Sequence, residues 1–302
     1  MVKLPSGVLV NKLINDLRDF SWEASDILLH YSEKIKNTLH RDQIIKSNND
    51  DPVTLADLKV NEIIIQRIND NYSAVDWDIL SEENIKIDST KQSINSNWLW
   101  VLDPLDGTKD FIQGTGNYAM HLALNYKNKP FLGVVLIPQK NELWISDSKN
   151  VWCERRDGSR FERNLFNNKS LHNMTLVTSK NHSNEKLNLL VDKIKFKKTI
   201  KMGSIGCKIA SILRGESDIY ICLSLPGKSY PKDWDFAAPA AILKAAGGAV
   251  TDLDNNDLIY NQINFEQKGI IIATSNSYEH SSICKKIKEI IRKYDLLPVY
   301  FN

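Results

Sequence analysis

Apolar residues recur along the chain at two spacings, one typical of amphipathic helices and the other of strands. The helical spacing predicts helices at residues 8–35, 58–68, 184–194 and 236–246, another around Lys208, and a basic helix at the C-terminal end. Apolar runs and alternating patterns predict strands at residues 98–102, 118–126, 131–137, 142–146, 176–180, 217–223, 248–253 and 269–274. Such a mixture predicts helices packed in layers on sheets.

The order of these elements predicts two domains. Short turns join the strands of the first half, which predicts an antiparallel sheet, whereas strands and helices alternate in the second half, which predicts a mixed α/β sheet. The polar stretch 156–173 is the best linker candidate. We therefore expect an N-terminal α+β domain at residues 1–165 and a C-terminal α/β domain at residues 166–302.

Composition agrees with a soluble protein of ordinary globular type. The 302 residues are 42% hydrophobic and 25% charged, and no run of about 18 apolar residues could form a spanning helix. The polar N-terminus lacks a signal-peptide core, so a cytoplasmic location without stable membrane association is expected. A net charge of +2 gives no strong nucleic-acid signal. The four cysteines have no Cys-x-x-Cys spacing, which favours reduced thiols, and the oligomeric state stays open.

The segment WLWVLDPLDGTKDF, residues 98–111, combines features of a metal site and a phosphate site. Its apolar start predicts a buried strand, which Pro104 is expected to end at Asp103. Asp103, Asp106 and the carbonyl of Leu105 offer the hard oxygen ligands that Mg²⁺ prefers. Gly107 would let a phosphate approach the backbone, and Thr108 would open a helical turn with free N–H groups. Taken alone, the motif is equally well explained as a polar turn with Asp103 as a cap.

Two other segments place acids at the ends of predicted elements. Glu82 and Glu83 follow the strand-like run 77–80 and precede a turn, although adjacent glutamates are usually a solvated surface. Asp235 follows Trp234 and precedes an Ala-rich helix, in the position of an N-cap. Helix capping alone would also explain it. The six histidines have no metal-ligand spacing and are expected to be structural or exposed.

The motifs SEE, DPLDGT, WDFAA and AGG occur in an order that resembles the lithium-sensitive, magnesium-dependent phosphatases of the inositol monophosphatase superfamily. Within it, DPVTLAD at residues 51–57, LSEE, DGTKDF and SIGCKIA are most similar to the CysQ-type 3'(2'),5'-bisphosphate nucleotidases. The resemblance implies a sugar-phosphatase-like αβαβα fold, with a metal-binding first domain, a substrate-binding second domain and the site between them.

The resemblance also implies roles for individual residues. Two or three Mg²⁺ ions would be held by Glu82, Asp103, the carbonyl of Leu105, Asp106 and Asp235. Thr108, paired with Asp57, would orient and deprotonate the attacking water, with Glu83 as a further catalytic residue. The alternative for Asp57 is a cap or first-turn acid of the helix that follows it. Substrate contacts would come from Glu82, Leu105, Asp106, Gly107, Thr108, Ser204, Lys208 and Asp235, with the backbone of residues 106–108 on the phosphate.

Three positions bear on the substrate. Lys109 and Asp110 stand where inositol-directed members have Thr and Asn, and a basic residue there suits a second phosphate. Lys208, with Ser204, is a candidate contact for the nucleotide end, although a lone lysine on a helix is equally explained as a surface residue. Pro239 replaces a Gly found in many relatives and is expected to restrict the start of its helix without removing a ligand.

The predicted activity is Mg²⁺-dependent hydrolysis of 3'-phosphoadenosine 5'-phosphate to AMP and phosphate. A role in sulfate assimilation is implied by the resemblance alone. The ligand would be a small bisphosphorylated nucleotide. An inositol monophosphatase is the alternative within the same chemistry, and a catalytically silent, metal-dependent nucleotide sensor is the alternative of another class.

Overall fold

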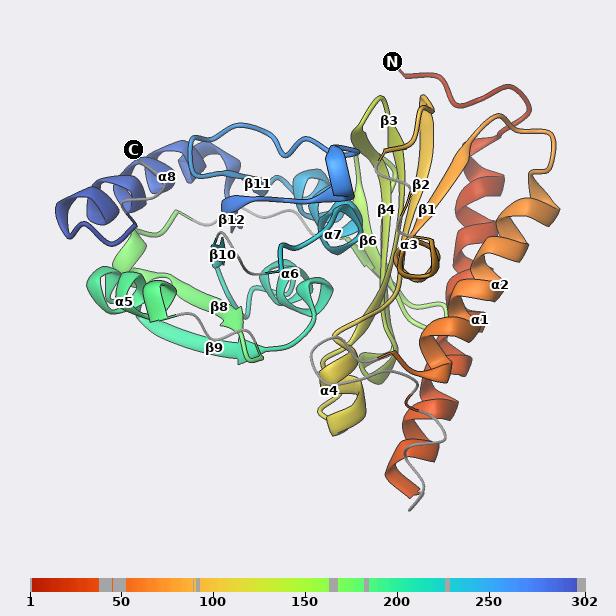
Figure 1. Cartoon of the computed structure of the whole chain (residues 1–302), viewed down its shortest axis with the longest axis horizontal. Coiled ribbons are helices and arrows are strands. Elements are labelled where there is room, and N and C mark those ends of the chain that lie inside the picture. Colours follow the sequence, from red (N-terminus) through yellow and green to blue (C-terminus); the bar gives the residue numbers. More distant parts are fainter. Residues whose placement is uncertain are drawn as a thin grey trace.

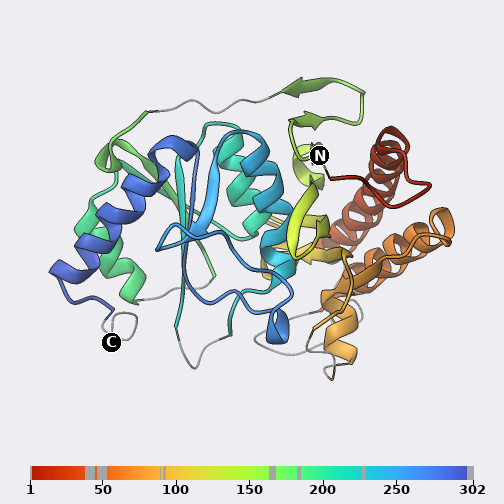
Figure 2. The same ribbon diagram turned by 90° about the horizontal axis from the view of Figure 1, so that it is seen from above.

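Five layers of helices and sheets make up the computed structural model, which describes residues 2–37, 45, 53–88, 90, 93–162, 168–181, 185–225 and 229–297. The helices α1 (Val10–Asn37) and α2 (Leu55–Asn71) cover the outer face of the first sheet (Figure 1). Helices α6 (Ile205–Leu213) and α7 (Asp233–Ala245) lie between the two sheets. Helices α5 (Glu185–Ile194) and α8 (Ser277–Lys293) cover the outer face of the second sheet (Figure 2). The expected αβαβα layering is confirmed.

In the described part of the chain, the first sheet contains seven strands in sequence order. Its strands are β1 (Asp78–Ser81), β2 (Trp98–Asp106), β3 (Ala119–Tyr126), β4 (Lys129–Ile137), β5 (Glu142–Ser146), β6 (Val151–Glu154) and β7 (Arg160–Glu162), and the short helices α3 (Glu82–Ile87) and α4 (Thr108–Gln113) follow β1 and β2. All neighbours pair antiparallel except β1 and β2, which are parallel. The expected antiparallel sheet is therefore confirmed apart from its first strand.

Strand β2 passes through Pro104 instead of ending at Asp103. Asp103 pairs with His121 and Asp106 with Ala119, so β2 advances three residues where β3 advances two. A bulge of this kind tolerates a proline, because the extra residue need not donate to the ladder. The prediction that the strand ends at Asp103 is therefore wrong, and the bulge places Asp103 and Asp106 together at the end of one continuous strand.

The second sheet is mixed, as expected. Its strands, in spatial order, are β11 (Ala249–Asp252), β12 (Gly269–Thr274), β10 (Ile219–Ser224), β8 (Thr175–Ser179) and β9 (Lys198–Met202). The strands β10, β8 and β9 run parallel, whereas β12 pairs antiparallel with both β10 and β11. The lysine-rich strand β9 forms an edge, where charged side chains oppose pairing with another chain.

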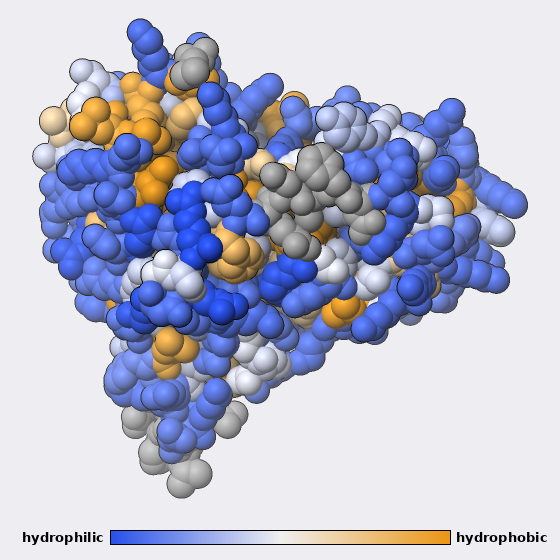
Figure 3. Space-filling view, turned by 180° about the vertical axis from the view of Figure 1, so that it is seen from behind, coloured by the Kyte–Doolittle hydropathy of each residue, from blue (hydrophilic) through white to orange (hydrophobic). Residues whose placement is uncertain are grey.

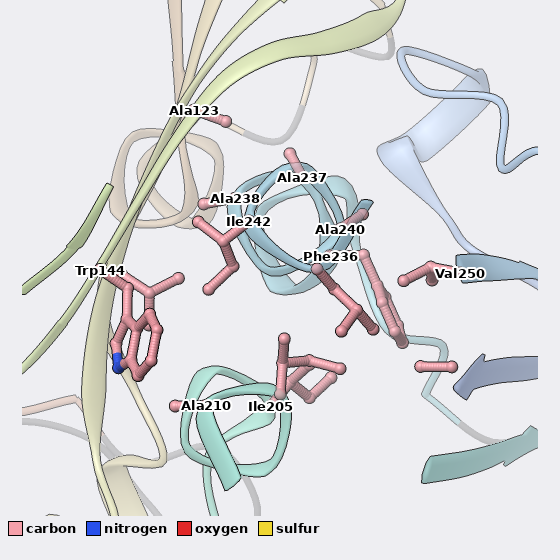
Figure 4. Packing of buried hydrophobic residues seen from close by; sticks show 14 of the residues in the cluster. Ala123, Trp144, Ile205, Ala210, Phe236, Ala237, Ala238, Ala240, Ile242 and Val250 are labelled. Atoms are coloured by element: carbon pink, nitrogen blue, oxygen red, sulfur yellow. The ribbon is translucent and has the colours of Figure 1, made fainter. Parts of the chain in front are cut away.

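Among the described residues, three hydrophobic clusters fill the spaces between the five layers. The central core joins α6 and α7 to both sheets. In Figure 4, Ala238 of α7 lies on the side of the helix toward the first sheet and Trp144, whereas Phe236 lies toward Val250 of the second sheet. Gly133 on β4 permits this close approach, since a Cβ there would lie 2.6 Å from the Cβ of Ala241 and 2.8 Å from the carbonyl oxygen of Ala238. Close packing thus fixes α7 against the sheet that carries β2.

Some sequence predictions fall on residues outside the described ranges, namely residues 51 and 52 of DPVTLAD, residue 184 and residues 163–167 of the linker candidate. The described parts of that candidate include strand β7 and, in residues 168–173, a short 3-10 helix at Leu171–Asn173, so the candidate is not simply a linker. All four cysteines are free, as expected, and three are buried. No described helix has the length and apolar character needed to cross a bilayer. The face in Figure 3 is mostly hydrophilic, with scattered apolar groups.

Candidate metal centre

Three aspartates converge where β2 ends and α7 begins. Asp103 and Asp106 flank the β2 bulge, and Asp235 lies in the first turn of α7. One carboxylate oxygen of each lies within 4.8 Å of the other two. The residues come from segments more than a hundred positions apart, and the packing of α7 on the first sheet brings them together.

Asp235 is held in place by its own helix terminus. It is the third residue of α7 and not the predicted N-cap, because Lys232 has extended backbone and the helix starts at Asp233. The backbone N–H of Lys232 donates to Oδ2 of Asp235 over 2.6 Å. Pro239 was expected to restrict the start of its helix, but α7 begins at Asp233 and Pro239 lies inside it. Since proline has no N–H, it leaves the carbonyl of Asp235 without the usual helical donor.

The electrostatics of the aspartates fit a bound cation. Burial, followed by the charges of Glu82, Asp106 and Asp235, raises the pKa of Asp103 well above its usual range. Burial and the charge of Asp106 likewise raise the pKa of Asp235. Carboxylates brought together in a buried volume repel one another, and a divalent cation relieves that repulsion. An all-carboxylate donor set suits a hard cation such as Mg²⁺.

Glu82 and Glu83 open helix α3 beside this cluster, where a turn had been expected. The ammonium of Lys86 lies 2.9 Å from Oε1 of Glu82 and 3.1 Å from Oε1 of Glu83. Glu82 is half-buried, and its charge contributes to the raised pKa of Asp103. Glu83 is only 2% exposed, so the interpretation of this pair as a solvated surface is wrong for Glu83.

Asp57 reaches the end of β2 from the first turn of α2. Its Oδ2 accepts hydrogen bonds from the backbone N–H of Thr54 (2.8 Å) and from the Thr54 hydroxyl (2.6 Å), forming a capping box. Its Oδ1 lies 3.4 Å from the hydroxyl oxygen of Thr108, which also contacts the carbonyl oxygen of Leu105 at 3.0 Å. Burial raises the pKa of Asp57 to about 7, aided by the charge of Glu83. Asp57 thus satisfies both interpretations, as a capping acid and as the partner of Thr108.

Gly107 joins β2 to α4 in a conformation that favours glycine. Its φ is 89°, and a Cβ would lie 2.9 Å from the carbonyl oxygen of Asn117 and 3.0 Å from the backbone nitrogen of Ser204. The positive φ and the short distances to a Cβ both disfavour any side chain at this position. The start of α4 therefore lies directly against the start of α6. Lys109, in the first turn of α4, is half-buried.

Ser204, the N-cap of α6, and Lys208, near the start of the same helix, lie next to Asp106. The Ser204 hydroxyl donates to Oδ2 of Asp106 (2.6 Å) and accepts from the backbone N–H of Cys207 (3.0 Å), capping α6. Lys208 is 3% exposed, and its ammonium donates to the carbonyl of Gly203. Burial lowers the pKa of Lys208. The surface-residue interpretation of Lys208 is therefore wrong, while contact of either residue with a nucleotide stays a prediction.

Sequence reasoning did not single out His121. This residue is fully buried, and its Nε2 lies 3.2 Å from Oδ2 of Asp106. Burial raises the pKa of Asp106, but His121, followed by Lys208 and Ser204, outweighs that effect and holds the pKa at about 2. Only the pairing of the two strands could have indicated this contact, because antiparallel pairing of β2 with β3 places His121 opposite Asp103.

The five-layer fold, with a cluster of carboxylates between its sheets, defines an α/β protein with a candidate metal site. The sequence profile described as the Inositol monophosphatase family matches residues 11–292. The chain therefore belongs to the inositol monophosphatase family, whose enzymes are metal-dependent.

Two curated relatives and one solved structure illustrate the similarity. The chain is 34% identical over 211 residues to the 3'(2'),5'-bisphosphate nucleotidase CysQ of Buchnera aphidicola subsp. Acyrthosiphon pisum (strain APS), covering 69% of this chain and 74% of the relative. It is 27% identical to 3'(2'),5'-bisphosphate nucleotidase 1 of Dictyostelium discoideum, covering 79% and 86%. An inositol monophosphatase from Zymomonas mobilis shares the fold, with a TM-score of 0.69, 20% identity, and coverage of 93% and 99%.

Proposed function

We propose that this chain is a 3'(2'),5'-bisphosphate nucleotidase that hydrolyses 3'-phosphoadenosine 5'-phosphate to AMP and phosphate. The relatives described as nucleotidases support the substrate class. The observation that carries the chemistry is the placement of the Thr108 hydroxyl 3.4 Å from Asp57, at the end of the strand that supplies Asp103 and Asp106. A hydroxyl between a buried carboxylate and an acidic cluster can direct a water molecule at a phosphate.

Glu82, Asp103, Asp106, Asp235 and the carbonyl of Leu105 would hold two or three Mg²⁺ ions. Bound Mg²⁺ would neutralise charge on the phosphate and make the attacking water more acidic. This donor set fits the ion, because carboxylate oxygens of Asp103, Asp106 and Asp235 lie within 4.8 Å of one another, and burial and the neighbouring carboxylates raise the pKa of Asp103.

The chain's own residues would move one proton during hydrolysis. The Thr108 hydroxyl has a single hydrogen, which it can give either to Leu105 or to Asp57. When it donates to Asp57, its lone pair can accept from the attacking water, so the water proton passes through Thr108 to the carboxylate. The water oxygen forms the new bond to phosphorus, the bond to the ribose 3'-oxygen breaks, and that oxygen takes a proton from solvent. The backbone of residues 106–108 would hold the phosphate during this step.

The location and domain roles form part of the same proposal. We expect a cytoplasmic enzyme of sulfate assimilation that acts on a free nucleotide. Residues 1–165 would form the metal-binding domain and residues 166–302 the substrate-binding domain, with Asp235 contributed to the metal site by the second. Lys109 would favour a substrate with two phosphates, and the second-domain residues Ser204 and Lys208 would contact its nucleotide end.

The test is phosphate release by the purified protein with Mg²⁺ from three substrates in parallel, namely 3'-phosphoadenosine 5'-phosphate, inositol 1-phosphate and fructose 1,6-bisphosphate. We expect the highest kcat/KM with the nucleotide. A clear preference for inositol 1-phosphate would identify an inositol monophosphatase instead. Nucleotide binding without turnover would identify a sensor, an outcome that the intact pair of Asp57 and Thr108 disfavours.

A further inference from the structure

The imidazole of His121 is placed between the three segments that form the metal centre. It projects from β3, is fully buried, and pairs across the sheet with Asp103. Its Nε2 lies 3.2 Å from Oδ2 of Asp106, and its Nδ1 lies 4.0 Å from Oδ2 of Asp103 and 3.3 Å from the carbonyl oxygen of Trp234. Trp234 directly precedes Asp235. One ring therefore lies against Asp106, within 4.0 Å of Asp103, and against the backbone of the residue that precedes Asp235.

Both nitrogens of this ring face oxygen acceptors. The 3.2 Å contact with Asp106 is close enough for an ion pair, but among the described residues Nε2 has no aligned hydrogen-bond partner. A buried polar atom in this condition is destabilising, and it is uncommon outside functional sites. Nε2 therefore faces the carboxylate of Asp106 and has no other partner among the described residues.

The neighbouring helix makes room for this ring. A Cβ on Gly206 would lie 2.2 Å from Nε2 of His121, so only glycine fits where α6 crosses β3. The backbone N–H of that same Gly206 donates to Oδ2 of Asp106 over 3.0 Å. Close approach of the α6 backbone therefore serves both the ring and the carboxylate.

Two hydrogen-bond donors and the Nε2 edge of the His121 ring surround one oxygen of Asp106. Its Oδ2 contacts the Ser204 hydroxyl at 2.6 Å, the Gly206 N–H at 3.0 Å and Nε2 of His121 at 3.2 Å. These contacts leave Oδ1 as the oxygen available to a cation. His121 is not one of the candidate metal ligands. Those are Asp103, Asp106 and Asp235, whose ligand atoms lie within 4.8 Å of one another.

We propose that His121 is a positioning residue that orients Asp106 for metal binding while its other nitrogen fixes the start of α7 through Trp234. The proposal rests on the proposed function only in assuming that the aspartates bind Mg²⁺. Polar groups that orient a metal ligand typically contribute about 10- to 100-fold to metal affinity, although they never touch the metal. Loss of the imidazole would therefore weaken metal binding without removing a ligand.

The experiment is calorimetric titration of Mn²⁺, as a probe for Mg²⁺, into the wild-type protein and into His121→Leu and His121→Gln. We expect a Kd about 10- to 100-fold higher for His121→Leu and a smaller increase for His121→Gln, which keeps an N–H donor. His280→Leu is the matched control, since it removes a second buried histidine that lies in α8 and contacts Thr251 and Thr274. Its Kd for Mn²⁺ should be unchanged.

Gly206→Ala supplies a second, independent variant if His121→Leu does not fold. Its Cβ would displace the ring while all three aspartates remain, so it should weaken Mn²⁺ binding as well. Wild-type affinity in a folded His121→Leu or Gly206→Ala protein would overturn the proposal. Failure of the wild-type protein to hydrolyse the nucleotide, with Mn²⁺ binding intact, would instead contradict the proposed substrate and leave the role of His121 measurable.

Discussion

The hydroxyl oxygen of Thr108 lies 3.4 Å from Oδ1 of Asp57, although 51 positions separate the two residues in the chain. Asp57 is anchored by Thr54 at the start of α2, and Thr108 is anchored at the start of α4. The pair therefore joins two helix termini at the end of β2. Both side chains are held by their own helix termini, as expected for groups that direct a nucleophile.

Thr108→Val should lower kcat by about 100- to 10,000-fold, because the variant keeps the shape of the side chain and removes the hydroxyl that relays the proton. Thr108→Ser restores a hydroxyl and should retain substantial activity. Steady-state kinetics with saturating Mg²⁺ measures both. Equal kcat values for the Val variant and the wild type would show that the water is activated elsewhere.

Asp106→Asn should abolish turnover while leaving the fold intact. The loss should exceed about 100-fold, since even an outer partner of a metal ligand is worth about 10- to 100-fold. Circular dichroism tests whether the fold is intact, and phosphate release measures the loss of turnover. Asp157→Asn changes an exposed carboxylate in the β6–β7 turn and should behave as the wild type. Near-normal activity of Asp106→Asn would refute the metal assignment.

Removal of divalent cations should destabilise the folded protein as well as inactivate it. Asp103 and Asp235 repel Asp106 in a buried volume, and a cation that binds only the folded state stabilises that state. We expect Tm to fall in EDTA and to rise with the logarithm of Mg²⁺ concentration. Differential scanning fluorimetry measures this, and Asp106→Asn should show a much smaller Mg²⁺ response.

Gly133→Ala should lower the free energy of unfolding by about 1 to 3 kcal/mol, the usual range for an overpacked core. The new Cβ would meet the backbone of α7 at Ala238, which cannot move without shifting Asp235. Activity should therefore fall together with stability. Urea unfolding gives the first quantity and kcat/KM the second; a change smaller than 0.5 kcal/mol, on the order of a surface substitution, would mean that α7 is not closely packed here.

Acid should destabilise the second half of the protein through His280. Burial lowers the pKa of His280 from 6.5 to about 4. As pH falls from 6.5 to 4, the unfolded chain takes up a proton that the folded chain refuses, so the free energy of unfolding decreases by about 2 to 3 kcal/mol in that window. Urea titrations at pH 4.5 and 7.0 measure the change. His280→Gln should show a smaller difference between these two pH values, and an unchanged difference would exclude His280 as the cause.

The sequence predicted what depends on local pattern. Apolar spacing located most helices and strands, and the motif order correctly predicted the family and the meeting of Asp103, Asp106 and Asp235. Pro104 was misjudged because a bulge is a property of two paired strands, which the sequence of one strand does not display. The burial of Lys208 was missed for a similar reason, since the second face of its helix packs on residues far along the chain.

His121 was not found from the sequence, because its place beside the aspartates depends on the register between β2 and β3. A histidine in an apolar strand has no spacing that marks it as part of a site, and only its pairing with Asp103 brings it to the cluster. The Gly206 that accommodates it is 85 positions away. Contacts of this kind depend on the packing of α6 against β3, which no local propensity predicts.

The division of the aspartates between β2 and the start of α7 has a consequence for biosynthesis. Asp103 and Asp106 leave the ribosome well before Asp235, because more than a hundred residues separate them. The whole first sheet is therefore synthesised while its carboxylate pair still lacks the third member, and α7 must dock against β4 before the trio is complete. A nascent chain interrupted before α7 would display an unfinished acidic site, so hydrolytic capacity arises only late in synthesis.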